Sequence, residues 1–165
     1  MDIQIFTTGG TIDKVYFDAK SAFEVGEPLA AEMLRTAGVA VDVHVEALMA
    51  KDSLDLSEAD RTAVVERVLA SPAARVVVTH GTDTMAATAR AVADALGAAS
   101  ERTVVFVGSL TPARFRDSDA PFNLGFALAC VQTLPPGAYV AMNGRVFGAH
   151  EVRKNRDANR FEPLA

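Results

Sequence analysis

Threonine hydroxyls in two glycine-containing loops are the groups of this chain best suited to chemistry. The loops are residues 7–14 (TTGGTIDK) and 78–85 (VTHGTDTM), and each follows an apolar, β-branched run. Glycine accepts positive φ values, so the backbone of such a turn can approach a ligand closely and expose a neighbouring hydroxyl. Two hydroxyls with a carboxylate and a lysine available could carry out nucleophilic attack on a carbonyl carbon.

Thr11 is our first choice for the nucleophile, because the preceding Gly9 and Gly10 let peptide N–H groups point into the same space. Threonine at a strand-to-helix turn usually caps the helix, and this alternative applies to both Thr11 and Thr82. The carboxyl ends of parallel strands lie along one edge of a sheet. The two loops are therefore expected to face one crevice.

Strands and helices alternate along the chain and would position these loops. Residues 41, 43 and 45 are valines that alternate with polar residues, which is typical of a strand with one wetter face. Ser57 followed by Asp60 predicts a helix start, and Asn143-Gly144 predicts a hairpin turn. The expected strands are residues 2–7, 39–48, 76–79, 103–107, 139–143 and 145–147, and the expected helices are 28–38, 84–96, 121–134 and one that begins after Ser57. This order predicts an α/β fold, a three-layer sandwich with a mostly parallel sheet.

Composition and charge exclude several classes of protein. The 165 residues suit a single domain, taken as residues 1–165, and 50% of them are hydrophobic. A net charge of −5 argues against nucleic acid or an anionic membrane as the main partner. The single cysteine, Cys130, allows no intrachain disulfide, and no apolar run reaches the roughly 20 residues of a membrane span. The N-terminus lacks the pattern of a targeting segment, so we expect a cytoplasmic, soluble protein.

The sequence suggests no cofactor. His44, His80 and His150 lie far apart without ligand spacing, so no metal site is expected. His80 instead borders the second loop as a supporting residue. The Gly9-Gly10 pair is not followed by the phosphate-binding pattern Gly-x-x-x-x-Gly-Lys.

At both loops the chain resembles the asparaginase/glutaminase family of amidohydrolases. Residues 8–12 (TGGTI) resemble the family's N-terminal signature, and residues 80–85 (HGTDTM) resemble its second signature. Three further stretches agree with the family pattern: residues 52–56, residues 120–124, and residues 142–144 leading to 151–154. The resemblance runs to about residue 161 and implies the fold of the family's N-terminal domain.

The resemblance implies roles for individual residues of these loops. Thr11 would be the attacking residue and Tyr16 its proton partner, and a tyrosine can act so only where positive charge or hydrogen bonds stabilise its phenolate. Thr82 and Lys154 would prepare the nucleophile or the attacking water. Asp83 would hold the α-amino group of the substrate, a charge-assisted contact that selects an amino acid over a simple amide.

The other implied contacts belong to substrate binding. Ser53 would contact the α-carboxylate, and Leu54, where many members have a polar side chain, predicts a weaker grip on that group. The implied substrate-binding residues are Gly10, Asp52, Ser53, Gly81, Thr82 and Asp83. Two alternatives stay open: Tyr16 could be a packing residue, and Lys154, in the basic run 153–156, could belong to a solvated face.

These residues predict an amidohydrolase that converts L-asparagine to L-aspartate and ammonia through a threonine acyl-enzyme, with no cofactor. A glutaminase or a mixed activity is the alternative enzyme, because one methylene changes binding by only about 1–3 kcal/mol. A non-catalytic amino-acid-binding domain is the alternative from another class of protein.

Length is where the chain departs from the family. Typical members carry a second, C-terminal domain that contributes to the site of a neighbouring subunit, and this sequence ends at Ala165 without one. We expect a short form that matches the N-terminal domain alone. An open crevice would leave the reacting amide in bulk water, so a homo-oligomer, a dimer or tetramer, is expected.

Overall fold

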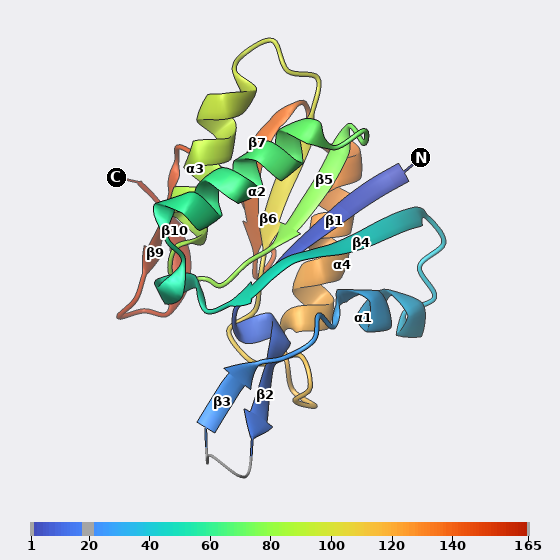
Figure 1. Ribbon diagram of the computed structural model, residues 1–165, viewed down its shortest axis with the longest axis vertical. Helices are drawn as coiled ribbons and strands as arrows, with labels where there is room; N and C mark the ends of the chain where they lie inside the picture. The colour runs from blue at the N-terminus through green and yellow to red at the C-terminus, as the bar shows by residue number, and fades with distance from the viewer. Residues whose placement is uncertain (1, 18–21, 165) are drawn as a thin grey trace.

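The computed structural model describes residues 2–17 and 22–164, and a six-stranded sheet forms its centre (Figure 1). The strand order is β4-β1-β5-β6-β7-β8, in which the first five strands are parallel and β8 is antiparallel to β7. The strands are β1 (Asp2–Gly9), β4 (Asp42–Lys51), β5 (Arg75–Thr79), β6 (Thr103–Val107), β7 (Gly137–Met142) and β8 (Arg145–Gly148). The predicted α/β fold with a mostly parallel sheet is confirmed.

Helices cover both faces of this sheet (Figure 1). Helices α2 and α3 lie on one face, and α1 and α4 lie on the other. The helices are α1 (Ala30–Thr36), α2 (Glu58–Ala70), α3 (Met85–Leu96) and α4 (Ala120–Thr133). Strands of a parallel sheet that is covered on both faces are buried on both sides, which explains the fully buried valine run 76–78 of β5. None of the helices in the described part of the chain is long and apolar enough to cross a membrane.

Local sequence signals begin and end several elements as predicted. Ser57 caps α2 in a capping box, because its Oγ accepts from the Asp60 N–H at 3.2 Å and the Asp60 Oδ2 accepts from the Ser57 N–H at 2.8 Å. Asn143 and Gly144 have positive φ values of 49° and 78°, and they form the turn between β7 and β8.

Contacts with distant residues set other boundaries. The alternating pattern predicts a strand at 39–48, whereas β4 begins at Asp42 and continues to Lys51 because it pairs with β1 from Asp2 to Gly9. Pairing with a neighbouring strand, rather than the local pattern, decides where this edge strand begins and ends.

Helix α1 is shorter than its predicted range of 28–38. The Leu29 N–H donates to the Asp13 Oδ1 at 2.9 Å, which fixes the chain to the loop after β1 immediately before the helix begins at Ala30. Gly38 has a φ of 63° just past the end of the helix, as is typical of a helix terminus.

Two antiparallel hairpins lie outside the central sheet. β2 (Lys14–Phe17) pairs with β3 (Ala22–Val25), and this hairpin projects beyond the end of the sheet (Figure 1). β9 (Val152–Asn155) pairs with β10 (Arg160–Pro163), and β9 contacts α3. The sequence predicts neither hairpin, because strands of four residues give too little alternation to be recognised where no turn signal such as Asn143-Gly144 joins them.

Candidate active site

The two threonine loops lie side by side because β1 and β5 are adjacent parallel strands, with Thr7 opposite Thr79. The loops touch through their glycines: a Cβ atom on Gly10 would lie 2.4 Å from the Gly81 Cα. Gly10 also has a φ of 86°, a value that favours glycine. The two backbones therefore meet at the edge of the sheet with no side chain between them.

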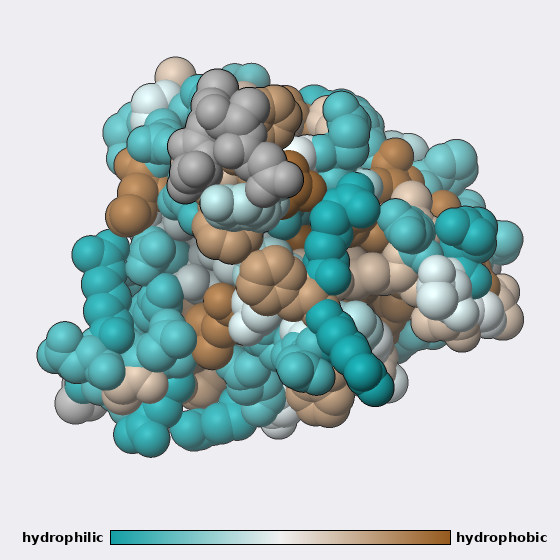
Figure 2. Space-filling model, turned by 90° about the horizontal axis from the view of Figure 1, so that it is seen from below, coloured by the Kyte–Doolittle hydropathy of each residue, from teal (hydrophilic) through white to brown (hydrophobic). Residues whose placement is uncertain are grey.

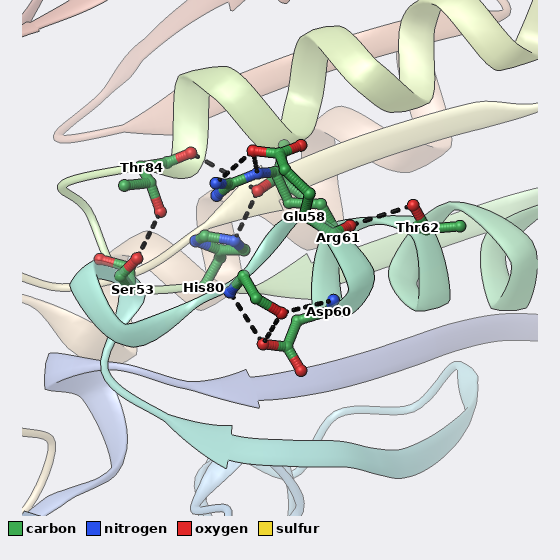
Figure 3. Close-up of polar contacts among 9 residues, drawn as sticks. Ser53, Glu58, Asp60, Arg61, Thr62, His80 and Thr84 are labelled. Atoms are coloured by element: carbon green, nitrogen blue, oxygen red, sulfur yellow. Dashed lines mark hydrogen bonds and ion pairs between the residues drawn. The ribbon is translucent and has the colours of Figure 1, made fainter.

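A third segment, the turn at Ser53, packs against the second loop. The short 3-10 helix η3 (Ser53–Asp55) follows β4, and a Cβ on Gly81 would lie 2.6 Å from both the Cβ and the Oγ of Ser53. Thr84 Oγ1 donates to the Ser53 carbonyl at 2.8 Å (Figure 3). Ser53 is buried, so its position is fixed by this packing.

Gly81→Ala is expected to disrupt the meeting point of these segments. The new Cβ would overlap Ser53, and overpacking of this kind lowers the free energy of unfolding by about 1–3 kcal/mol. Gly125→Ala is the matched control, because Gly125 is exposed within α4 with open space around its Cβ and alanine there should stabilise by about 0.5–1 kcal/mol. Urea denaturation compares the two variants, and equal effects would contradict the close contact.

Lys154 joins the second loop from β9. Its Nζ donates to the Thr82 Oγ1 at 2.7 Å and to the Asp83 Oδ1 at 2.9 Å. The Lys154 side chain is only 11% exposed and Thr82 is buried, so the lysine does not belong to a solvated face. The N-cap of α3 is Thr84. Thr82 therefore does not cap this helix, and its hydroxyl accepts the hydrogen bond from Lys154. A hydroxyl that accepts from an ammonium keeps its own proton available for donation.

Thr11 is the first residue of the short 3-10 helix η1 (Thr11–Asp13) and is partly buried. Within the described ranges its hydroxyl makes no hydrogen bond, and η1 has no side-chain cap. The expectation that peptide N–H groups point into this space does not hold for Gly10, whose N–H donates to the Lys51 carbonyl at 2.9 Å. Pairing of β1 with the end of β4 takes up that donor.

Tyr16 lies on β2 and is 53% exposed. Its ring meets the edge of Phe23 on β3, with the ring centroids 5.3 Å apart. In the part of the chain that the structure describes, no hydrogen bond joins the Tyr16 hydroxyl to Thr11. The structure therefore joins Thr82, Asp83 and Lys154 by hydrogen bonds, and no hydrogen bond among the described residues joins the Tyr16 hydroxyl to any of them.

Asp52, the residue before Ser53, makes two contacts that hold the turn. Its carboxylate lies 2.6 Å from the Lys14 Nζ on β2 and accepts from the Leu54 N–H at 3.1 Å. Burial acts to raise the pKa of Asp52, but the hydrogen bonds from Lys14 and Leu54 outweigh it and hold this pKa below its ordinary value. Asp52 therefore acts as an ionised anchor of the turn.

His80 supports the second loop from within the core. Its Nδ1 lies 2.7 Å from the Gly81 carbonyl oxygen, and its Nε2 lies 2.9 Å from the Thr88 Oγ1. Burial lowers the pKa of His80 to about 4, and the positive charge of Arg61 on α2 adds to this effect (Figure 3). The imidazole is therefore neutral near pH 7, with Nδ1–H donating to Gly81 and the Thr88 hydroxyl donating to Nε2.

Asp13 is a buried carboxyl for which the local sequence pattern contains no signal. Its Oδ1 accepts from the Leu29 N–H, its peptide carbonyl accepts from the Gly26 N–H at 2.8 Å, and its buried Oδ2 makes no hydrogen bond within the described residues. Burial raises the pKa of Asp13 to about 6, although the Leu29 hydrogen bond acts in the opposite direction. Asp13 thus ties the first threonine loop to the segment that follows β3.

Charges of alternating sign surround these loops. Lys14 pairs with Asp52, and the charge of Lys154 also lowers the pKa of Asp52. Asp83 pairs with Lys154 and lies 3.5 Å from the Arg156 Nε. No local pattern points to Lys14 or Arg156, because each contacts a partner that is distant along the chain. In residues 2–17 and 22–164, no group of three or more His, Cys, Asp or Glu could hold a metal ion.

Fold and loops together define a three-layer α/β domain of the asparaginase type. The family described as "Asparaginase, N-terminal" matches residues 2–163, and the chain therefore belongs to the asparaginase family. This confirms the resemblance seen at the two glycine loops.

Individual relatives agree with this assignment. A "Glutaminase-asparaginase" from Acinetobacter glutaminasificans is 30% identical over 93% of this chain and 49% of that protein. A "Probable L-asparaginase periplasmic" from Haemophilus influenzae is 41% identical over 47% of this chain and 23% of that protein. The solved thermostable L-asparaginase from Thermococcus kodakarensis superposes with a TM-score of 0.86 at 27% identity, over 99% of this chain and 51% of that chain. The chain spans about half of the length of the Acinetobacter and Thermococcus relatives and 23% of the Haemophilus relative.

Proposed function

We propose that this protein is an amidohydrolase that converts L-asparagine into L-aspartate and ammonia through an acyl-enzyme on Thr11. The observation that carries the proposal is the 2.7 Å contact between the Lys154 Nζ and the buried Thr82 hydroxyl. The loop that contains Thr82 contacts the loop that contains Thr11. The Thr11 hydroxyl makes no hydrogen bond with any of the described residues. A domain that only bound an amino acid would have no use for a lysine and two hydroxyls in this arrangement.

The proposed reaction has two stages. The Thr11 Oγ attacks the side-chain carbonyl carbon of asparagine, its proton passes through a base to the leaving nitrogen, and ammonia departs. Water activated by Thr82 and Lys154 then attacks the resulting ester and releases L-aspartate. Asp83 holds the α-ammonium group by a charge-assisted hydrogen bond. For Tyr16 to serve as the proton partner of Thr11, the β2–β3 hairpin must bring its hydroxyl to the threonine.

Ammonia release from L-asparagine, L-glutamine and D-asparagine, measured side by side on the purified protein, tests this function. We expect L-asparagine to react fastest. Glutaminase or mixed activity is the second candidate, because the Acinetobacter relative is named a glutaminase-asparaginase. Binding of L-aspartate without ammonia release from any of the three would favour a non-catalytic amino-acid-binding domain and overturn the proposal.

Asp83→Asn is expected to raise the KM for L-asparagine by about 10-fold or more, with a smaller effect on kcat. The amide oxygen can still accept from Lys154, whereas the negative charge that attracts the substrate ammonium is lost. Steady-state kinetics separates the two constants. The control is Asp94→Asn, since Asp94 is exposed on α3 and pairs with His150 away from the loops. A fall in kcat at unchanged KM would contradict the ammonium contact.

We also propose that the protein is a homo-oligomer, a dimer or tetramer, in which a second copy covers the candidate site. Exposed aromatic side chains on and beside the β2–β3 hairpin support this proposal: Tyr16, Phe17, Phe23 and Phe115 are each 45–53% exposed. Figure 2 views the molecule from the hairpin end, where hydrophobic side chains lie among hydrophilic ones. Apolar clusters of this kind mark interaction surfaces. Light scattering at assay concentration is expected to show at least a dimer, and an active monomer would contradict the proposal.

The proposal includes no cofactor and places the protein in the cytoplasm. Cys130 is the single cysteine of the chain, so no intrachain disulfide requires an oxidising compartment. The Haemophilus relative is named periplasmic, whereas a solved relative from Campylobacter jejuni is named a probable cytoplasmic L-asparaginase. Fractionation of the native host decides between them.

A further inference from the structure

Arg156 lies at the edge of the candidate site on the turn between β9 and β10. Its Nε is 3.5 Å from the Asp83 Oδ1, the same oxygen that accepts from Lys154. The turn has a defined shape, because the Asn155 side chain accepts from the Ala158 N–H at 3.0 Å. The Arg156 side chain is nevertheless 63% exposed, so its guanidinium is open to a ligand.

Of the three cations in the row of charges around the loops, Arg156 has the most unused donors. Lys14 is occupied by Asp52 at 2.6 Å, and Lys154 by Thr82 and Asp83. The two terminal nitrogens of Arg156 make no hydrogen bond with any residue that the structure describes. A guanidinium presents its donors as a planar fork that matches a carboxylate with two parallel hydrogen bonds.

We propose that Arg156 binds the α-carboxylate of the substrate and makes the site specific for free α-amino acids. This inference rests on the proposed function, because it names what that site recognises. A free amino acid carries an ammonium and a carboxylate on one carbon, and Asp83 and Arg156 present the complementary pair of charges side by side. The Ser53 side chain can add only a neutral hydroxyl, and the Leu54 side chain has no polar group. Arg156 therefore supplies the positive charge on which discrimination against α-amides and peptides depends.

The test compares two substrates that differ only at the α-carboxylate. L-asparagine has this group, and L-asparagine α-N-methylamide replaces it by a neutral amide while keeping the α-ammonium and the scissile side-chain amide. Arg156→Gln is expected to lower kcat/KM for L-asparagine by about 10–100-fold, mainly through KM, because a hydrogen-bonded charge contact is lost. The same variant should change kcat/KM for the N-methylamide by less than about 2-fold.

Two further variants sharpen the comparison. Arg156→Lys keeps the charge without the fork and should recover part of the loss. Arg153→Gln is the matched control, since Arg153 is an exposed arginine of β9 that lies 3.7 Å from Glu162, and it should leave both substrates unchanged.

The outcomes separate the possible roles of Arg156. A loss confined to L-asparagine supports carboxylate recognition. An equal loss with both substrates would show that Arg156 acts only through Asp83, and no loss would show that it is a solvated surface residue; either result overturns the inference.

Failure of the proposed function can be told apart from failure of this inference. If Arg156→Gln changes kcat/KM by the same factor for L-asparagine and for the N-methylamide, the inference is wrong. The proposed amidohydrolase activity is unaffected by that result. If neither substrate releases ammonia, the proposed function fails, and calorimetric titration with L-aspartate and its α-N-methylamide applies the same contrast to binding. A Kd for L-aspartate that rises in Arg156→Gln by about 10–100-fold, with the N-methylamide unaffected, supports the inference. Absence of that contrast, including absence of any binding, overturns it.

Discussion

Thr11→Ala and Thr82→Ala are each expected to lower kcat for L-asparagine by at least about 10³-fold, because removal of one member of a cooperating catalytic group removes most of its effect. The hydroxyl of Thr11 is the proposed nucleophile. The hydroxyl of Thr82 is the group that the Lys154 ammonium contacts at 2.7 Å. Ammonia release under saturating substrate measures both variants. Near-full activity of Thr11→Ala would show that the threonine mechanism is wrong.

A variant of Lys154 distinguishes the roles of the two threonines. Lys154→Met removes the ammonium that contacts Thr82, so breakdown of the acyl-enzyme should slow and the intermediate should accumulate on Thr11. Peptide mass spectrometry of enzyme quenched during turnover locates the adduct. Lys51→Met is the control, since Lys51 pairs with Asp60 on α2. An adduct on Thr82 would reverse the two roles and leave the reaction class intact.

Two buried titratable groups are expected to oppose each other in the pH dependence of stability. The pKa of Asp13 is about 6 in the folded protein and 3.8 ordinarily, so the folded state binds the extra proton and stability is lost as pH rises from about 4 to 6. The pKa of His80 is about 4 in the folded protein and 6.5 ordinarily, so stability is lost as pH falls from about 6.5 to 4. Each shift corresponds to about 3 kcal/mol, and the two act in opposite directions.

Asp13→Asn removes one of the two opposing groups, so the pH dependence of its free energy of unfolding should reflect the lowered pKa of His80. Because the two effects have opposite signs, the free energy of unfolding of the wild-type protein is expected to depend less on pH between pH 4.5 and pH 7 than that of Asp13→Asn. Asp13→Asn removes the buried charge, so it should be more stable than wild type at pH 7 by up to about 3 kcal/mol and lose this advantage towards pH 4.5. Urea denaturation across this range measures both proteins.

The control for this experiment is Asp55→Asn, because Asp55 is exposed on η3. Its pH profile should follow that of the wild type. Parallel profiles for wild type and Asp13→Asn would contradict the raised pKa of Asp13, and a flat profile for Asp13→Asn would contradict the lowered pKa of His80.

The sequence by itself determined the fold class and the position of the two loops. Continuous valine runs such as 76–78 occur where a strand is buried on both faces, and the capping pair of Ser57 and Asp60 is a purely local signal. Gly10 and Gly81 predict the turns of the two loops, because turn formation depends on residues that are adjacent in the sequence. Signals of this kind depend on neighbouring residues, so they can be read without the tertiary structure.

Only the tertiary structure decided which side chains meet. The pairing of Lys14 with Asp52, and the approach of Arg156 to Asp83, depend on the paths of two short hairpins that have no clear pattern of their own. The burial of Asp13 depends in the same way on the distant backbone of Leu29. These contacts follow from strand register and chain packing, which join residues that are far apart along the chain, and no local spacing encodes them.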